Sequence, residues 1–382
     1  MPAISNFQGI GTYSHQTPFY PGGAYVSWPL AGYKPTYMNQ WNLSIQRQMG
    51  KDWLLTANYV GNNTIHMLSE EQTNPGVFLG LGSCQLYNNN VLTTYPTCST
   101  TANTQARRVL NIQNPQQGQY YSTMAMVDEG GTAEYEGLYV SAQKRLSHGL
   151  TAQANYTWSH CISDPYDFNS SSTGFAVPGN RREWRSNCIG VDLRQLFVLN
   201  LVATTPKFSN RWARILGSNW QIAPLLELKS ATFFTAFVGT DRALTGVGSQ
   251  TPNLVNTDPY PANQTLSNWL NAAAFTPATP GTYGNLGYNN LKGPDIFQLN
   301  VALSRTFAVR EKMSLQLRAE AFNLPNHVNG FAPGVAPINT GIGANTTLTS
   351  ATATQVTADI SGNNGGLAGD YRVIQFAMKF VF

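Results

Sequence analysis

Cysteine, histidine and clustered arginine are the residue types in this chain whose spacing could support chemistry. The 382 residues include four cysteines and five histidines. The cysteines form two local pairs, Cys84 with Cys98 and Cys161 with Cys188, in long segments rich in Gly, Asn, Ser and Thr. Local pairs in loops that face an oxidising compartment predict two disulfides, each contributing about 2–4 kcal/mol.

The spacing of these residues does not support a metal site or a catalytic site. There is no Cys-x-x-Cys spacing, and His160 beside Cys161 lacks a second ligand cluster, which argues against zinc. The same two residues cannot act as base and nucleophile, because neighbours on a strand point to opposite faces. No glycine loop for phosphate follows a strand. We therefore expect neither an enzyme nor a cofactor.

A basic and aromatic cluster is the other candidate site. It consists of Arg181, Arg182, Trp184 and Arg185. Guanidinium groups bind carboxylate and phosphate well, so this loop could hold an anionic ligand or lipopolysaccharide phosphates. The alternative, which we favour, is a solvated loop cluster. The net charge of +4 is small and the basic residues form no stripe, so we expect no nucleic-acid partner.

The composition favours a β-protein with one apolar and one polar surface. Charged residues make up 11% of the chain, against roughly 25% in ordinary soluble domains. Aromatic residues reach 12%. No run of about 18 apolar residues exists, so no helical membrane span is predicted. A barrel that is apolar outside and polar inside would have this composition, and so would a secreted β-protein.

The C-terminal segment 371–382 reads YRVIQFAMKFVF and has the clearest strand pattern. Every second residue is apolar: Ile374, Phe376, Met378, Phe380 and Phe382. Successive side chains of a strand point to opposite faces. A soluble sheet rarely exposes phenylalanines at an edge, because such an edge recruits other chains. A transmembrane barrel uses that face for lipid, and a buried last strand of a soluble sandwich is the alternative.

Three hairpins repeat this alternation, and two more strands are expected. The hairpins span residues 41–59, 138–158 and 297–321. The additional strands are 196–203 and 220–228, the second weakened by Pro224. The polar residues that alternate with the apolar ones are predicted to face the lumen. They are Gln46, Asn58, Gln143, Asn155, Gln316, Arg318 and Glu320. We expect Arg318 and Glu320 to join a charge network; a merely solvated wall is the alternative for each position.

The connections between strands alternate in length. Short connections are expected at 49–52, 146–149, 205–218 and 308–312, and long ones follow at about 61–133, 160–193, 230–295 and 324–369. Short periplasmic turns and long outer loops are typical of outer-membrane barrels, whereas loops this long are uncommon inside compact soluble domains. We predict an all-β, antiparallel up-and-down transmembrane β-barrel with long extracellular loops. Residues 41–382 would supply about nine strands, and residues 1–40 an outer loop or partial strand.

Three segments resemble the C-terminal barrel strands of Oar-like TonB-dependent outer-membrane receptors. They are WNLSIQRQMGKDWLLTANYVG, GLYVSAQKRLSHGLTAQANYTWSHCISD and FQLNVALSRTFAVREKMSLQLRAEAFNLPNHVNGF. The resemblance implies the C-terminal part of a barrel of about 22 strands, preceded by a plug and a regulatory-like domain. The absent signal peptide and the odd strand count also indicate a truncated chain. One departure is Gln195, which follows Asp-Leu-Arg where the family has His.

The resemblance also implies the function and partners that we expect. The barrel would take up an unknown ligand across the bacterial outer membrane, with energy from TonB engaged through the missing N-terminal part. Its partners would be outer-membrane lipid, lipopolysaccharide and the barrel-assembly machinery, which recognises a C-terminal strand ending in Phe. Two alternatives are an outer-membrane adhesion or scaffold protein without transport and a secreted, soluble β-sandwich that binds glycans.

Overall fold

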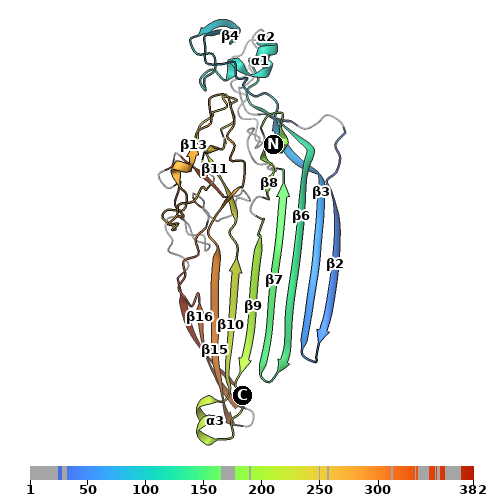
Figure 1. Cartoon of the computed structure of the whole chain (residues 1–382), viewed down its shortest axis with the longest axis vertical. Helices are drawn as coiled ribbons and strands as arrows, with labels where there is room; N and C mark the ends of the chain where they lie inside the picture. Colours follow the sequence, from blue (N-terminus) through green and yellow to red (C-terminus); the bar gives the residue numbers. More distant parts are fainter. Residues whose placement is uncertain are drawn as a thin grey trace, which may run out of the picture.

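In the part of the chain that the structure describes, nine long antiparallel strands lie side by side in one sheet (Figure 1). The computed structural model describes residues 25–27, 32–164, 177–188, 191–248, 250–255, 258–310, 313–331, 333, 344–348, 350, 353–357 and 371–382. The order along the sheet is β18-β16-β15-β10-β9-β7-β6-β3-β2. Each strand therefore pairs with its nearest long neighbour in sequence, as an up-and-down fold requires. The chain has the predicted all-β, antiparallel architecture.

The strand bounds follow the alternating segments of the sequence. The long strands are β2 (Tyr37–Met49), β3 (Trp53–Gln72), β6 (Met124–Ser147), β7 (Leu150–Ser163), β9 (Gln195–Thr204), β10 (Trp220–Lys229), β15 (Ile296–Arg310), β16 (Met313–Phe322) and β18 (Val373–Val381). Two short strands join them, β1 (Tyr25–Ser27) beside β6 and β8 (Ser186–Asn187) beside β7. β2 begins inside the segment 1–40, which was expected to be an outer loop or partial strand; residues 1–24 and 28–31 lie outside the described part.

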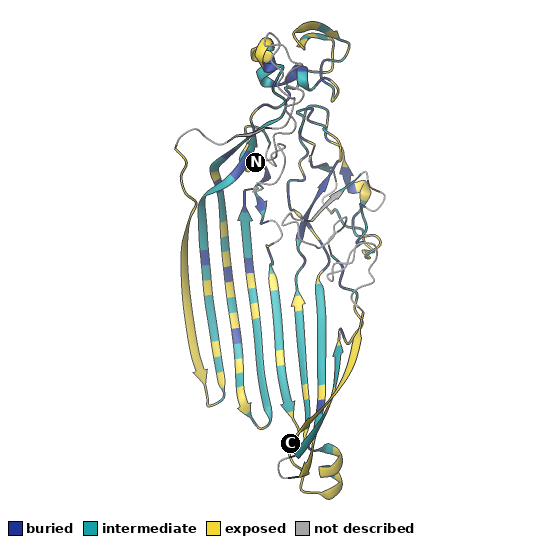
Figure 2. Ribbon diagram, turned by 180° about the vertical axis from the view of Figure 1, so that it is seen from behind, coloured by how far each residue is buried: buried dark blue, intermediate teal, exposed yellow. Residues whose placement is uncertain are grey.

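The register gives the sheet two chemically different faces. One row across the strands joins Ile45, Ala57, Val140, Tyr156 and Phe197. The adjacent row joins Gln46, Thr56, Ser141 and Asn155. Exposure alternates in the same way along stretches of β3 and β6, whereas β2 and β18 are exposed over their whole length (Figure 2). We call these the apolar face and the polar face.

The tight turns keep this register. Between β6 and β7 only two residues intervene, His148 and Gly149, with φ of 50° and 75°. Two left-handed residues make a turn whose twist matches that of the flanking strands. A side chain at position 149 would also come within 2.5 Å of the Thr204 carbonyl oxygen. Glycine is therefore required there by backbone conformation and by space.

β3 and β6 are longer than the sequence pattern indicated. They have 20 and 24 residues and stay paired up to Gln72 and Ala125, inside the segment expected to be a loop. Residues 124–127 accordingly belong to β6 and form no separate strand. The extension is irregular, since the register shifts near His66, whose φ is 59°. Gly131 allows the close approach there, because a Cβ would lie 2.6 Å from the Met67 carbonyl oxygen.

Pro224 lies inside a central strand despite the expectation against it. β10 pairs with β15 through Pro224 and Val301. On the β9 side the described pairing skips from Ile222 to Leu225. Proline has no N–H to donate, and the strand accommodates it at an interruption of one ladder.

The outer connections contain short elements of their own. These are β4 (Cys84–Asn88), β5 (Val91–Tyr95), η2 (Gln105–Arg107), α1 (Val109–Gln113), α2 (Pro115–Gly118), η3 (Arg181–Trp184), β11 (Phe233–Phe237), β12 (Asn253–Leu254), η4 (Ala272–Ala274), β13 (Phe275–Thr276), β14 (Leu291–Lys292) and β17 (Ala344–Thr347). They gather at one end of the sheet (Figure 1), and we call them together the loop layer. Its core includes Phe234, Leu270, Phe275 and Leu291.

The opposite end of the sheet carries the short turns and one helix. α3 (Arg211–Gly217) lies in the connection 205–218, where the sequence analysis expected only a turn (Figure 1). Asn210 caps it by accepting hydrogen bonds from the Trp212 and Ala213 amides. None of the helices in the described residues combines the length and the apolar character needed to cross a bilayer.

An arginine substitution should have a large effect on stability on the apolar face and a small one on the polar face. Val140 lies on the apolar face of β6 midway between Glu136 and Lys144, and Gln143 lies on the polar face of the same strand. Val140→Arg should lower the free energy of unfolding in lipid vesicles by about 2–4 kcal/mol, because a charge must then be buried in hydrocarbon. Gln143→Arg should change it by less than about 0.5 kcal/mol. Urea unfolding monitored by heat-modifiable gel migration measures both; equal losses would contradict the assignment of the faces.

Candidate functional site: the polar face and the loop layer

The side chains predicted to line a lumen all lie on the polar face. Gln46 is opposite Thr56, Asn58 is opposite Ser44, and Gln143 is opposite Gln153. This arrangement follows from the two-residue period of each strand together with the antiparallel register. The result is a polar wall that reaches from β2 to β18 but is interrupted on β9 and β10 by apolar side chains of the same face, among them Val198, Val202 and Leu225.

Asn155 is the centre of a hydrogen-bond network on this wall. Its Oδ1 accepts from the Tyr139 and Ser141 hydroxyls, each at 2.8 Å, and from Gln153 Nε2 at 3.3 Å. Asn58 of β3 has a buried Oδ1 that has no hydrogen-bond partner among the described residues. A buried acceptor of this kind is available to a hydrogen-bond donor from a solute or from another part of the protein.

Charged residues of the wall are the Glu227–Lys229 ion pair on β10 and a group near the C-terminal end of the chain. Arg318 forms an ion pair with Glu320, two residues away on the same face of β16. Gln375 of β18 donates a hydrogen bond from Nε2 to the Glu320 carboxylate. Gln316 lies opposite Lys379 on the same pair of strands. The wall thus offers both charge signs and neutral amides to a polar solute.

The C-terminal strand β18, which we expect the barrel-assembly machinery to recognise, lies at one end of the strand order. β18 pairs with β16 over nine residues, from Val373 opposite Phe322 to Val381 opposite Ser314. Ile374, Phe376, Met378 and Phe380 lie on its apolar face, and Phe382 follows the strand. Phe376 is 82% exposed and Phe382 90%. Side chains of this size and exposure are suited to lipid.

The arginine cluster is not the free basic patch on which an anion site would depend. Arg181 forms ion pairs with Glu71 and Asp128. Arg182 and Arg185 both contact the buried Asp164. The guanidinium groups are therefore neutralised by carboxylates from other segments, which the local sequence does not reveal.

Trp184 has a packing role in the same cluster. Only 1% of the residue is exposed, and its ring stacks on Tyr288 with centroids 5.6 Å apart. Asn187 and Asn289 exchange hydrogen bonds close by, each Nδ2 donating to the other's carbonyl oxygen at 2.8 and 3.1 Å. This cluster joins the loop that follows β7 to the loop that follows β10.

The four cysteines are paired as the spacing suggested. Cys84 is bonded to Cys98 and Cys161 to Cys188, with Cα atoms 5.2 and 5.3 Å apart. The first bridge links β4 to the segment that follows β5. The second links the outer end of β7 to the loop beyond it. Both cross-links are in the loop layer and restrict its freedom.

Two buried arginines in the loop layer were not singled out in the sequence. Arg107 is fully buried, and its Nη1 donates to the carbonyl oxygens of Val77 at 2.6 Å and Leu244 at 2.8 Å. Its Nη2 donates to the Thr100 carbonyl at 2.8 Å, and its Nε to Asn103 Oδ1 at 3.0 Å. One side chain therefore ties the loop after β3 to the loop after β10.

Arg108 holds together the two ends of the connection between β3 and β6. Its Nη1 donates to the Asn74 carbonyl oxygen at 2.7 Å, and its Nη2 to the Thr123 hydroxyl at 2.9 Å. Burial lowers the pKa of Arg108 to about 10, with the neighbouring charge of Arg107 acting in the same direction. The group stays protonated at neutral pH, and so all its N–H donors remain available.

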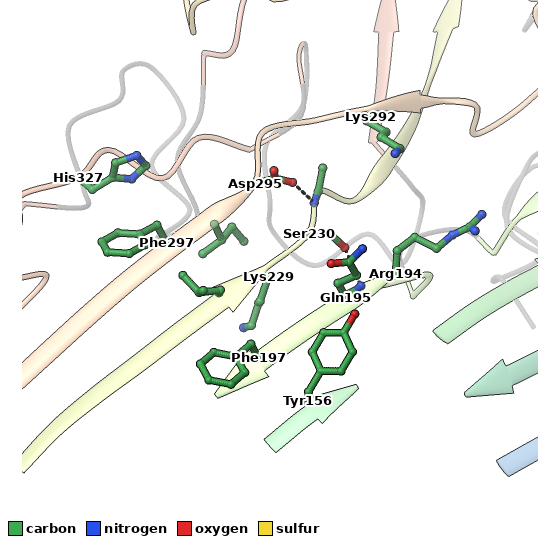
Figure 3. Close-up of a pocket in the computed structure, with 13 residues that line it drawn as sticks. Tyr156, Arg194, Gln195, Phe197, Lys229, Ser230, Lys292, Asp295, Phe297 and His327 are labelled. Carbon is green, nitrogen blue, oxygen red and sulfur yellow. Dashed lines mark hydrogen bonds between the residues drawn. The ribbon is translucent and has the colours of Figure 1, made fainter. Parts of the chain in front are cut away.

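A cavity of about 690 Å³ lies where β7, β9, β10 and β15 meet the loop layer (Figure 3). Its apolar lining includes residues of the apolar face: Tyr156, Phe197, Leu228 and Phe297. Arg194 and Lys292 lie 5.2 and 5.9 Å from the centroid of the Phe233 ring. Asp295 Oδ1 accepts from the Ala231 amide at 2.8 Å.

The segment with the unusual Gln195 borders this cavity. Asp192 accepts a hydrogen bond from the Cys161 amide at 2.7 Å and pairs with Arg194 at 2.8 Å. The Gln195 amide N–H donates to the Ser230 hydroxyl at 3.0 Å, while its side chain is exposed. The charged residues of the segment therefore hold the loop against the strand ends.

His327 also lines the cavity. His327 Nδ1 contacts Asn329 Oδ1 at 3.2 Å, and its ring lies edge-on to Phe297 at 5.8 Å. It has no described carboxylate or nucleophile as a hydrogen-bond partner. No group of three or more His, Cys, Asp or Glu side chains in the described residues is placed to hold a metal ion.

A protein family matches most of this chain. A family model described as "Outer membrane beta barrel domain" matches residues 3–375. No curated protein matches the chain. The crystal structure of the outer membrane transporter YddB from Escherichia coli is similar with a TM-score of 0.42 and 10% sequence identity. The match covers 94% of this chain and 34% of that one, so this chain spans about a third of the transporter's length.

The buried arginine predicts how the loop layer is held together. Arg107→Leu should remove the side-chain donor from the Val77 and Leu244 carbonyl oxygens, and each acceptor left unpaired when buried costs about 1–3 kcal/mol. Asn103 Oδ1 keeps the hydrogen bond from the Thr100 amide. We expect protease cleavage within residues 73–123 to become at least about tenfold faster. Arg145→Leu, which removes an exposed arginine near the short turns, is the control and should leave cleavage unchanged. Unchanged cleavage in both variants would show that Arg107 does not hold the junction.

Proposed function

Because the chain belongs to the family of outer membrane β-barrel domains, we propose that it forms part of the barrel of a TonB-dependent transporter. In this proposal the loop layer captures a ligand outside the cell, and the ligand then passes along the polar face. The strand segments that resemble Oar-like receptors support the TonB-dependent class. The energy-transducing contact would be made by parts of the receptor that these residues do not supply.

The polar face, which spans the sheet from β2 to β18 apart from apolar positions on β9 and β10, is the observation that carries this proposal. A barrel that only anchored a protein would need lipid-facing residues outside and a packed or solvated interior. Here amides, hydroxyls and an ion pair follow one another from Gln46 through Asn155 to Arg318 and Glu320. A solute that leaves water can exchange its hydrogen bonds for those of such a wall, which lowers the cost of passage.

The loop layer would provide selectivity in this mechanism. Its buried junctions, including Arg107 with Leu244 and Trp184 with Tyr288, fix the outer loops against one another. A pre-ordered surface loses less conformational entropy on binding than mobile loops would.

A second candidate function is that of a surface adhesion or scaffold protein. The observation that favours it is the size and order of the loop layer, which has its own apolar core around Phe234 and Phe275. A folded surface of this kind could bind a partner without any transport. The two functions differ in whether the polar face is used.

Uptake in living cells separates the two functions. A strain without the gene, and the same strain with the full-length gene restored, are grown in a defined mixture of iron chelates, oligosaccharides and peptides. We expect at least one compound to disappear from the medium only in the restored strain, and only when TonB is present. Compound-by-compound depletion is measured by mass spectrometry.

A variant of the polar wall serves as the internal control. Arg318→Ala combined with Glu320→Ala should slow this uptake severalfold while the amount of protein in the outer membrane stays the same. Normal outer-membrane levels without any gene-dependent depletion would contradict transport. That outcome would favour the adhesion or scaffold function.

A further inference from the structure

Arg305 is a charged residue on the apolar face of β15. The preceding positions of the same parity are Phe297, Leu299, Val301 and Leu303, all apolar. Eight residues at roughly 3.3 Å each separate Arg305 from Phe297 along the strand. With a strand tilt of about 40°, this is a depth of roughly 20 Å in an apolar band about 25 Å tall. Arg305 thus lies near the boundary with the headgroups on the short-turn side.

The surroundings of Arg305 leave part of its hydrogen-bonding capacity unused. Its guanidinium carbon lies 5.2 Å from the Trp220 ring centroid and 4.6 Å from that of Phe307. Nη2 donates to the carbonyl oxygen of Ile215 in α3. Nε is buried and has no partner, and no carboxylate in the described residues forms an ion pair with the group. A half-paired, partly buried cation is costly unless an anion completes it.

An apolar groove adjoins this guanidinium. Its volume is about 490 Å³. The apolar side chains that line it are Trp220, Leu303, Phe307, Leu317, Phe376 and Met378. These residues come from β10, β15, β16 and β18 and belong to the apolar face, which must contact lipid. A groove of this shape and polarity fits a hydrocarbon chain.

α3 supplies a second, independent sign of a membrane surface. Trp212, Ile215 and Leu216 have the i, i+3, i+4 spacing of one helix face, and they are 70%, 48% and 67% exposed. Trp220 Nε1 donates to the Leu216 carbonyl oxygen at 2.7 Å and so holds the helix against the sheet. Exposed large apolar side chains beside a lipid-facing surface are typical of a helix that lies in the interface.

The charge of this turn indicates which lipid would bind. The connection 205–218 contains Lys207, Arg211 and Arg214 and no acidic residue. With Arg305 the region presents four positive charges to whatever covers it. Clustered basic residues at a membrane surface attract anionic headgroups.

We propose that Arg305, the adjoining groove and α3 form a binding site for an anionic glycerophospholipid of the periplasmic leaflet. The lipid phosphate accepts hydrogen bonds from Arg305, and one acyl chain lies in the groove beside Phe376 and Met378. α3 rests in the headgroup layer with Trp212 and Leu216 toward the acyl chains. The site requires an outer-membrane barrel but is independent of transport, so it can hold or fail separately from the proposed function.

Native mass spectrometry of the full-length protein in detergent tests the site. The probes are phosphatidylglycerol and phosphatidylcholine with identical acyl chains. Arg305→Gln keeps a donor for the Ile215 carbonyl but removes the charge, and Arg310→Gln removes a charge from the same strand without touching the groove. We expect wild type to prefer phosphatidylglycerol, and Arg305→Gln to weaken that binding about tenfold. Arg310→Gln should stay within about twofold of wild type.

Each possible result decides for or against the site. Equal binding of the two lipids by wild type, or unchanged phosphatidylglycerol binding by Arg305→Gln, would overturn it and leave Arg305 as a partner of α3 alone. Both variants are first checked for the heat-modifiable band of a folded barrel. If Arg305→Gln does not fold, Trp212→Ser with Leu216→Ser replaces it. That double variant should also weaken phosphatidylglycerol binding severalfold, and unchanged binding would count against the site.

Discussion

The pairing of backbone polar groups is the constraint on which the rest of this structure depends. A peptide N–H or C=O inside hydrocarbon has no water to bind, so each strand must form hydrogen bonds with the peptide groups of its neighbouring strands. Hydrogen-bonded strands give a period of two, and this period fixes which side chains meet lipid. A slip of one residue in β7 would exchange Asn155 for Tyr156 and bring amides to the apolar face. Register, polarity and the route for a polar solute therefore follow from one requirement.

Outside the membrane the same constraint is met in a different way. The outer loops are too irregular for a ladder, and their backbone carbonyls are satisfied by buried side chains such as Arg107. Disulfides and the Trp184–Tyr288 stack add further junctions. The outer loops become a folded layer whose surface is set by contacts between distant segments. Order of this kind suits either capture of a ligand or binding of a partner.

The sequence predicts the membrane part of the fold well and the loop layer poorly. Alternation is a local signal, and it located the hairpins, the short turns and the two faces, because each strand pairs with its neighbour along the chain. It underestimated β3 and β6, whose outer extensions contain a bulge at His66 and little alternation. α3 was taken for a turn, although Trp212, Ile215 and Leu216 have helical spacing. The partners of Arg107 and Arg181 lie far away in sequence, and no local pattern indicates such contacts.

Spin-label accessibility along β15 is the most direct test of the central claim, which is a two-faced sheet in a bilayer. Single labels are placed at each position from 297 to 304 of the full-length protein in lipid vesicles. The structure requires collision with oxygen, which concentrates in lipid, to be high at 297, 299, 301 and 303. Collision with a water-soluble nickel chelate should be high at the intervening positions. A uniform profile, or one with the helical period of 3.6, would contradict the account.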